Sequence, residues 1–88
     1  MGQLSEMPNI GKELENCLIQ VGINTPDELK NIGSCKAFQL ISAFDSSACF
    51  SKLCALEGAI QGIRWHKLDT DTKQRLKEYL NLLHLSTR

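Results

Sequence analysis

The chain of 88 residues has few of the features that indicate catalysis, membrane insertion or nucleic-acid coating. It has one tryptophan and two histidines, and its ten basic residues balance ten acidic ones. Proteins that coat nucleic acid or anionic membranes usually carry a clear basic excess, so this balance argues against that class. No apolar run approaches the roughly 20 residues of a membrane span, and no signal peptide or myristoylation signal opens the chain. We therefore expect a cytoplasmic protein without a membrane anchor.

The composition is that of one ordinary globular domain spanning residues 1–88. Hydrophobic residues make up 42% of the chain and charged residues 23%, well outside the disordered range. Residues 1–44 hold three bases against five acids (−2), and residues 45–88 hold seven against five (+2). The second half is therefore slightly more basic than the first.

The four cysteines are Cys17, Cys35, Cys49 and Cys54, and no two have the C-x-x-C spacing. They would allow three disulfide pairings. Because they lie among apolar neighbours and no secretory signal is present, we expect reduced, mostly buried thiols. Two histidines and unspaced cysteines match no standard metal-ligand pattern, so we expect neither a metal nor a cofactor.

Helix start and stop signals are clear in the first half of the chain. Apolar residues at helical spacing are followed by Gly22, a typical residue just past a helix end. In "TPDEL", Thr25 can cap a helix, Pro26 suits the first helical position, and Glu28 completes a capping box. That short helix is predicted to stop at Gly33.

Three further helices follow. Ser34 is predicted to cap the third helix, and Asp-Ser-Ser at 45–47 to cap a longer one from about 48 to 63. Asp69 or Thr70 is predicted to cap the last. No window shows strand alternation.

The predicted fold is all-α: a compact five-helix domain around the helix at 48–63, with one additional turn in residues 2–7. Nearly every position of that central helix is apolar or small, which is typical of a helix surrounded by others. Trp65 is expected to cover the base of the core. The predicted core residues are Leu14, Leu18, Leu29, Leu40, Leu53, Leu56, Ile60, Trp65 and Leu80.

Two glycines four residues apart, Gly58 and Gly62, lie in this central helix. Each costs the helix about 1 kcal/mol relative to alanine. Glycines with such a cost are retained where close packing of a neighbouring helix offsets it, so we interpret both as helix-packing positions. A phosphate loop would need a strand–loop–helix setting, which is absent from the sequence pattern.

Glu57, Gln61 and Arg64 form one narrow polar stripe on the same helix. The simpler interpretation is a solvent-facing seam or a local hydrogen-bond set. The alternative is a carboxylate acting as an acid or base, with His66 as its partner. Because no nucleophile–base pair has a meaningful spacing, we predict no catalytic residues and no enzyme activity.

The segment 7–23 resembles a helix-hairpin-helix element, in which turn N–H groups and the following helix bind a DNA phosphate. Asn9 stands where that pattern has its first glycine, and asparagine tolerates positive φ. Glu13 and Glu15 follow at once, which weakens the electrostatic attraction for phosphate. This resemblance indicates a fold of the SAM-like or helix-hairpin-helix-like type. Its candidate phosphate contacts are Asn9, Ile10, Gly11 and Lys12.

From about Met7 to Leu80 the chain resembles the C-terminal domain of TfoX, the bacterial competence regulator. The resemblance is carried by Asn-Ile-Gly at 9–11, Gly-Ile-x-Thr-Pro-x-x-Leu-x-x-Ile-Gly at 22–33, and Ala-Leu-Glu-Gly-Ala-Ile-Gln-Gly at 55–62. It implies a compact helical domain, often fused to a TfoX N-terminal domain and associated with transcriptional regulation of DNA uptake. It supplies no catalytic or binding residues. We expect a stand-alone domain, so a competence role cannot simply be inherited.

Two functions of different class remain. The first is a regulatory interaction module that associates with a protein partner or a second copy through Leu82, Leu83 and Leu85 at the end of the last helix. The alternative is DNA binding at the hairpin. That binding would be aided by basic residues of the second half, namely Lys67, Lys73, Arg75 and Lys77.

Overall fold

The computed structural model describes residues 4–43 and 49–86, with side chains described through residue 83. Within these ranges the chain is all helical and contains no strand, which confirms the predicted fold class. Its elements, in order, are η1 (Leu4–Glu6), α1 (Lys12–Gln20), α2 (Pro26–Ile32), α3 (Ser34–Ser42), α4 (Phe50–Gln61), η2 (Trp65–Lys67) and α5 (Thr70–Ser86). No helix of the described part is long and apolar enough to cross a membrane.

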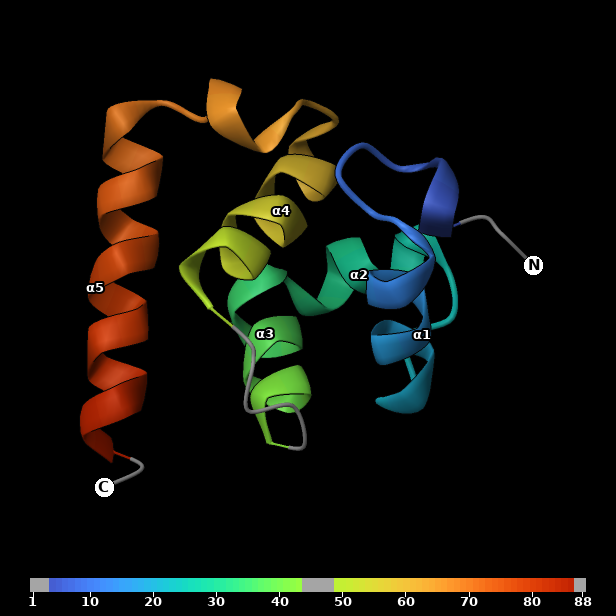
Figure 1. Cartoon of the computed structure of the whole chain (residues 1–88), viewed down its shortest axis with the longest axis horizontal. Coiled ribbons are helices and arrows are strands. Elements are labelled where there is room, and N and C mark those ends of the chain that lie inside the picture. Colours follow the sequence, from blue (N-terminus) through green and yellow to red (C-terminus); the bar gives the residue numbers. More distant parts are fainter. Residues whose placement is uncertain (1–3, 44–48, 87–88) are drawn as a thin grey trace.

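Helix α4 lies at the centre of the contacts, as the sequence predicts. It packs against α2, α3, α5 and η2. Figure 1 shows α5 along one side of the molecule, with the η2 segment connecting the end of α4 to the start of α5. The loop before α1 approaches the same end of α4 from the other side (Figure 1). Two segments far apart in sequence therefore meet where α4 ends.

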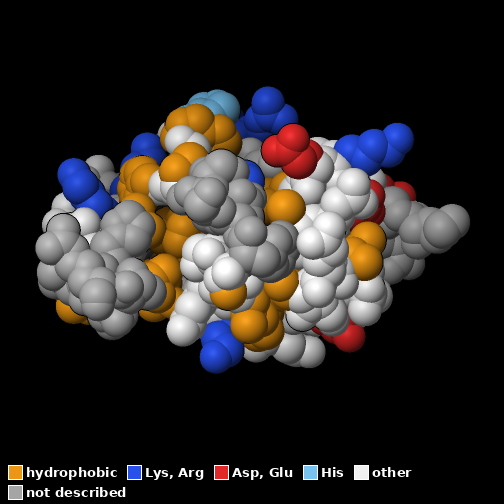
Figure 2. Space-filling model, turned by 60° about the horizontal axis from the view of Figure 1, so that its bottom comes forward, with side chains coloured by type: hydrophobic (Ala, Val, Ile, Leu, Met, Phe, Trp, Pro, Cys, Tyr) orange, Lys and Arg blue, Asp and Glu red, His pale blue; other side chains and the backbone are white. Residues whose placement is uncertain are grey.

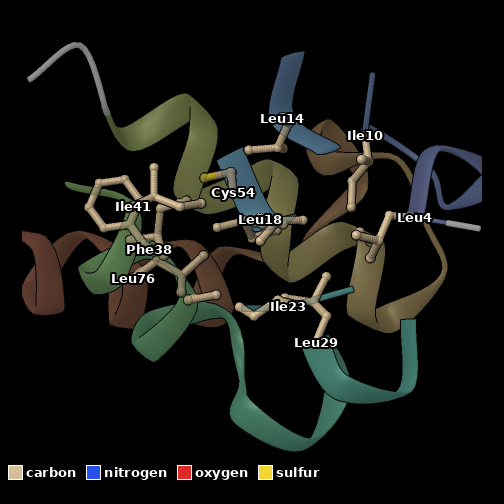
Figure 3. Close-up of a cluster of buried hydrophobic side chains, with 14 of the residues drawn as sticks. Leu4, Ile10, Leu14, Leu18, Ile23, Leu29, Phe38, Ile41, Cys54 and Leu76 are labelled. Carbon is tan, nitrogen blue, oxygen red and sulfur yellow. The ribbon is translucent and has the colours of Figure 1, made fainter. Parts of the chain in front are cut away.

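One hydrophobic core runs between these helices. Figure 3 shows Leu4 and Ile10 toward one end of the buried cluster and Phe38 and Ile41 toward the other, with Leu18 between them. All five are buried. The additional turn expected in residues 2–7 is η1, and its Leu4 belongs to this core. Of the predicted core residues, the structure buries Leu14, Leu18, Leu29, Leu53, Leu56 and Leu80.

Three predicted core residues are less buried than expected. Leu40 and Ile60 are half-buried, and Ile60 still packs against the core. The prediction that Trp65 covers the base of the core is wrong, because 39% of the surface of this residue is exposed. Leu68, which is buried, contributes to the core at this turn. Leu68 therefore takes the core position at this turn, and the indole ring is partly exposed.

The predicted capping residue of α2 is confirmed. The backbone N–H of Glu28 donates to Oγ1 of Thr25 at 3.2 Å, and Pro26 is the first helical residue. The carboxylate of Glu28 accepts from the N–H of Asn24 at 2.8 Å, one residue before the partner of an ideal capping box. The local sequence therefore specifies this helix start.

Other predicted helix ends differ from the structure. Gly33, and not Ser34, is the N-cap of α3, and the side chain of Ser34 points into the protein. Helix α4 was expected at 48–63 and spans Phe50–Gln61, with Cys49 as its N-cap. The Asp-Ser-Ser cap at 45–47 lies outside the described residues.

Of the two residues predicted to cap the last helix, Asp69 is the one whose side chain does so, directly before α5. Its Oδ1 accepts a hydrogen bond from the backbone N–H of Thr72 at 2.8 Å. Hydrogen bonds from the hydroxyl and then the backbone N–H of Thr72 lower the pKa of Asp69. The ionised carboxylate is thus the form that the folded helix start prefers.

We predict that Asp69→Asn reduces the pH dependence of stability in the acid range. The folded-state pKa of Asp69 is lowered, so its contribution is present above the unfolded value of about 3.9. This contribution is lost as the pH falls through the folded-state pKa. Urea unfolding from about pH 7 to about pH 3 should therefore show a shallower acid loss in the variant. Asp71→Asn, an exposed carboxylate in the same first turn, is the control, and equal slopes for both variants would contradict the prediction.

Candidate functional site at the hairpin turn and the end of α4

The turn before α1 adopts the conformation that the sequence suggests. Asn9 has a φ of 70°, in the left-handed region that asparagine tolerates better than most residues. The N–H of Met7 donates to the carbonyl of Leu4 at 3.0 Å, and the N–H of Ile10 donates to the carbonyl of Met7 at 3.4 Å. Gly11 then caps α1 with an extended backbone. The chain reverses between η1 and α1 within these few residues.

The side chain of Asn9 connects this turn to the end of α4. Its Nδ2 donates to the carbonyl of Ile63 at 2.9 Å and to that of Ala55 at 3.5 Å. Its Oδ1 accepts from the backbone N–H of Trp65 at 3.0 Å. One amide group thus satisfies backbone groups on both sides of the helix end. We call this set of three hydrogen bonds the Asn9 clamp.

Gly58 makes the close approach of the clamp possible. A Cβ at this position would lie 2.6 Å from Nδ2 of Asn9 and 2.8 Å from the carbonyl oxygen of Ile63. Gly58 therefore packs tightly, but against the hairpin turn and the chain after α4. Gly62 is not the packing position that the sequence predicts. A Cβ there would meet no atom within 4 Å, and Gly62, with a φ of 78°, is the C-cap of α4. Its role is to end the helix, which only a residue tolerant of positive φ does without strain.

The four candidate phosphate contacts divide into two pairs. Asn9 directs its amide into the clamp, and Ile10 is buried in the core. Gly11 and Lys12 are exposed at the start of α1. A ligand could therefore reach Gly11 and Lys12 directly, whereas Asn9 and Ile10 build the turn.

A small open pocket lies beside the clamp and was not predicted from the sequence. Its volume is about 300 Å³, and it is lined by Pro8, Gly62, Ile63, Arg64 and Lys67. Arg64 and Lys67 are exposed. Trp65, the residue after Arg64, forms an edge-to-face contact with His66 at a ring-centroid distance of 5.6 Å. Figure 2 shows a histidine at one rim of the molecule, over hydrophobic side chains and next to a basic group.

Glu57 and Gln61 of the predicted polar stripe form a hydrogen-bonded seam on α4, whereas Arg64 lies beyond the end of the helix, just before η2. Oε2 of Glu57 accepts from Nε2 of Gln61 at 2.6 Å, which matches the local hydrogen-bond set expected from the sequence. Oε1 accepts from the hydroxyl of Ser34 at 2.6 Å, a partner that the sequence spacing did not suggest. His66 is not among the hydrogen-bond partners of Glu57 in the described part. The carboxylate joins the start of α3 to α4.

The thiols near this seam are poorly suited to act as nucleophiles. Burial raises the pKa of the Cys35 thiol, and the negative charge of Glu57 raises it further. Burial also raises the pKa of Cys54. The thiolate is the reactive form of cysteine, so these groups are held in the less reactive state. All four cysteines are unpaired, but only Cys54 is fully buried and Cys49 is exposed, so "mostly buried" was too strong.

The candidate interaction surface on α5 is partly described. Leu82 is 65% exposed, whereas Leu83 is half-buried and packs against the core. The side chain of Leu85 lies outside the described residues. Tyr79, one turn earlier, donates its hydroxyl to the carbonyl of Cys35 at 3.1 Å and so ties α5 to α3. No group of three metal-ligating side chains occurs in the described part of the chain.

We predict that Asn9→Gly destabilises the fold by about 1–3 kcal/mol, because it keeps the backbone conformation and removes all three clamp hydrogen bonds. Asn9→Ala should cost roughly 1 kcal/mol more, since alanine resists positive φ. Asn9→Asp keeps the acceptor for the N–H of Trp65 but places an oxygen against the carbonyls of Ile63 and Ala55, so it should destabilise at least as much as Asn9→Gly. Urea unfolding measures all three. Wild-type stability in Asn9→Gly would show that the clamp contributes nothing.

Comparisons with known proteins agree with the helical architecture. A crystal structure of an uncharacterized protein from Listeria monocytogenes (triclinic form) has a TM-score of 0.90 and 58% identity, covering 92% of each chain. A crystal structure of a protein of unknown function from the same organism (tetragonal form) has a TM-score of 0.86 and 58% identity, covering 90% of this chain and 98% of that one. No curated protein matches. The model of the TfoX C-terminal domain matches residues 1–80, and the chain therefore belongs to the TfoX C-terminal domain family.

Proposed function

We propose that this domain is a non-enzymatic, regulatory interaction module that acts by protein–protein association through the C-terminal end of α5. The observation that carries the proposal is Leu82, a large apolar side chain with 65% of its surface exposed. Its neighbour Leu83 is half-buried, so the apolar surface continues from the core outward. Family membership suggests a role related to competence regulation, which supports a regulatory activity.

The energetics of an exposed leucine fit association. Burying a leucine side chain contributes about 1.5–3 kcal/mol. In a symmetric dimer the same surface is used twice, so one leucine per copy doubles this contribution. Leu85 belongs to the same helix as Leu82, three residues further along the chain. Such an interface depends on apolar burial and is nearly indifferent to salt.

We predict that Leu82→Glu abolishes association. Sedimentation velocity of the wild-type protein should show concentration-dependent association that persists between about 0.1 and 0.5 M salt. The variant should remain monomeric, because the interface would have to bury an unpaired carboxylate. Asn81→Glu is the matched control: it adds the same charge at an exposed position about 100° away around the helix. A wild-type monomer at every concentration would refute self-association and leave a different protein as the partner. That partner's binding should then be lost in Leu82→Glu and kept in Asn81→Glu.

DNA binding at the hairpin is the second candidate. The observation that favours it is the turn itself, with Asn9 at positive φ and with Gly11 and Lys12 exposed at the start of α1. A helix N-terminus attracts phosphate. The exposed Glu13 beside Lys12 opposes that attraction.

If DNA binding holds, Lys12→Glu should weaken the affinity for a fluorescent DNA duplex, and the affinity should fall steeply with salt. Lys30→Glu is the control, since Lys30 is an exposed lysine on α2 away from the turn. Fluorescence anisotropy at low and moderate salt measures both. Equal loss in the two variants would indicate only a general charge effect and would reject a hairpin site.

A further inference from the structure

Two cations line the pocket beside the Asn9 clamp, and they come from the segment that follows α4. Arg64 immediately precedes η2 and Lys67 ends it. The clamp fixes this segment, because Asn9 binds the backbone of Ile63 and Trp65 on either side of Arg64. The cations are therefore presented by a held backbone and not by a free loop.

The charges of this pocket are available to a ligand. Within the described residues, no carboxylate pairs with the side chain of Arg64 or Lys67. The remaining lining, from Pro8, Gly62 and Ile63, contains no acidic group. A pocket of about 300 Å³ is at the lower end of the range for specific ligand sites and can hold one or two side chains.

The segment that carries these cations also carries a partly exposed aromatic residue, which is not itself part of the pocket lining. Trp65 is 39% exposed and lies between Arg64 and Lys67 in sequence. Tryptophan and arginine are the residues most enriched at the energetic centres of protein interfaces. The exposed part of the Trp65 side chain is apolar area that a bound partner would bury, with a gain of about 25 cal/mol per Å².

We infer that this pocket is a second binding site, separate from the end of α5, and that it takes an acidic segment of a partner protein. The partner would place a carboxylate between Arg64 and Lys67 and an adjacent apolar side chain against Trp65 and Ile63. Charge complementarity selects the acidic group, and the apolar lining selects a peptide over a simple anion.

The surroundings favour a short acidic segment over nucleic acid. The two lining cations neutralise about two phosphates, and Lys73, whose Nζ donates to the carbonyl of His66 at 3.4 Å, adds one further charge beside them. So few cations give little affinity for an extended polyanion. The neighbouring elements carry acids, with Glu6 exposed in η1 and Glu13 exposed in α1. These carboxylates oppose the approach of an extended phosphate backbone along η1 and α1.

The test uses the single tryptophan of the chain as its reporter. The probe is a blocked pentapeptide of sequence serine-glutamate-leucine-glutamate-serine, titrated while the emission of Trp65 is recorded. Saturable binding is expected, and Arg64→Gln/Lys67→Gln should weaken it at least about fivefold. The counterpart peptide with glutamine in place of glutamate should bind similarly weakly. Circular dichroism of the variant confirms that it is folded.

The control is Lys30→Gln/Lys36→Gln, which removes the same charge from exposed positions on α2 and α3 and should leave peptide binding unchanged. Inorganic phosphate and a short single-stranded DNA are titrated in parallel. The inference is overturned if no peptide binds, if phosphate alone gives the same response, or if DNA binds more tightly through Arg64 and Lys67. Because Leu82 is not involved, Leu82→Glu should bind the peptide normally whether or not the α5 end associates.

Discussion

The arrangement of the hairpin turn against the end of α4 depends on the three hydrogen bonds of the Asn9 side chain. They join residue 9 to backbone groups 46 to 56 residues later in the chain. Two conditions must hold for them to form. Asn9 must adopt positive φ, and residue 58 must lack a Cβ. Each condition disfavours most residue types, and together they leave one arrangement of the turn against α4.

The clamp separates positioning from recognition at this site. Both N–H groups of the Asn9 amide donate to backbone carbonyls, and its oxygen already accepts from the N–H of Trp65, so the side chain has no donor left for a ligand. Its effect is to hold Pro8 against the segment that carries Arg64 and Lys67. The clamp positions the segment with Arg64 and Lys67, and the side chains of these two residues take no part in its hydrogen bonds.

The two candidate surfaces lie at opposite ends of α5. The helix begins just after η2 and spans 17 residues, a length of about 25 Å. Figure 1 shows its C-terminal end on the far side of the molecule from the hairpin turn. An apolar contact at one end and a charged pocket at the other can therefore be occupied at the same time. If both proposed sites bind proteins, the domain can hold two partners together.

The sequence predicted the elements of the fold well because its helix signals are local. The cap at Thr25, the stop at Gly22 and the cap at Asp69 each depend on a few neighbouring residues. Contacts between distant segments were not predictable in the same way. Ser34 has the composition of a cap, yet its hydroxyl binds Glu57 on another helix.

The candidate site was predicted less completely than the fold. The hairpin residues were identified, but no spacing rule pairs Pro8 with Arg64 or Asn9 with Trp65. Trp65 was expected to cover the base of the core where the chain turns into the last helix. Leu68 belongs to that core, and the tryptophan remains at the surface.

The family motifs contain the residues that build the clamp and the end of α4, and they do not contain the exposed residues of the pocket segment. The motif at 9–11 contains Asn9, and the motif at 55–62 contains the carbonyl acceptor of Ala55, the close approach at Gly58 and the helix end at Gly62. These residues build the clamp and the turn after α4. Arg64, Trp65 and Lys67 follow directly after the second motif, on the segment that the clamp holds in place. A change of partner could therefore be made by substituting these exposed residues while every contact of the clamp is retained.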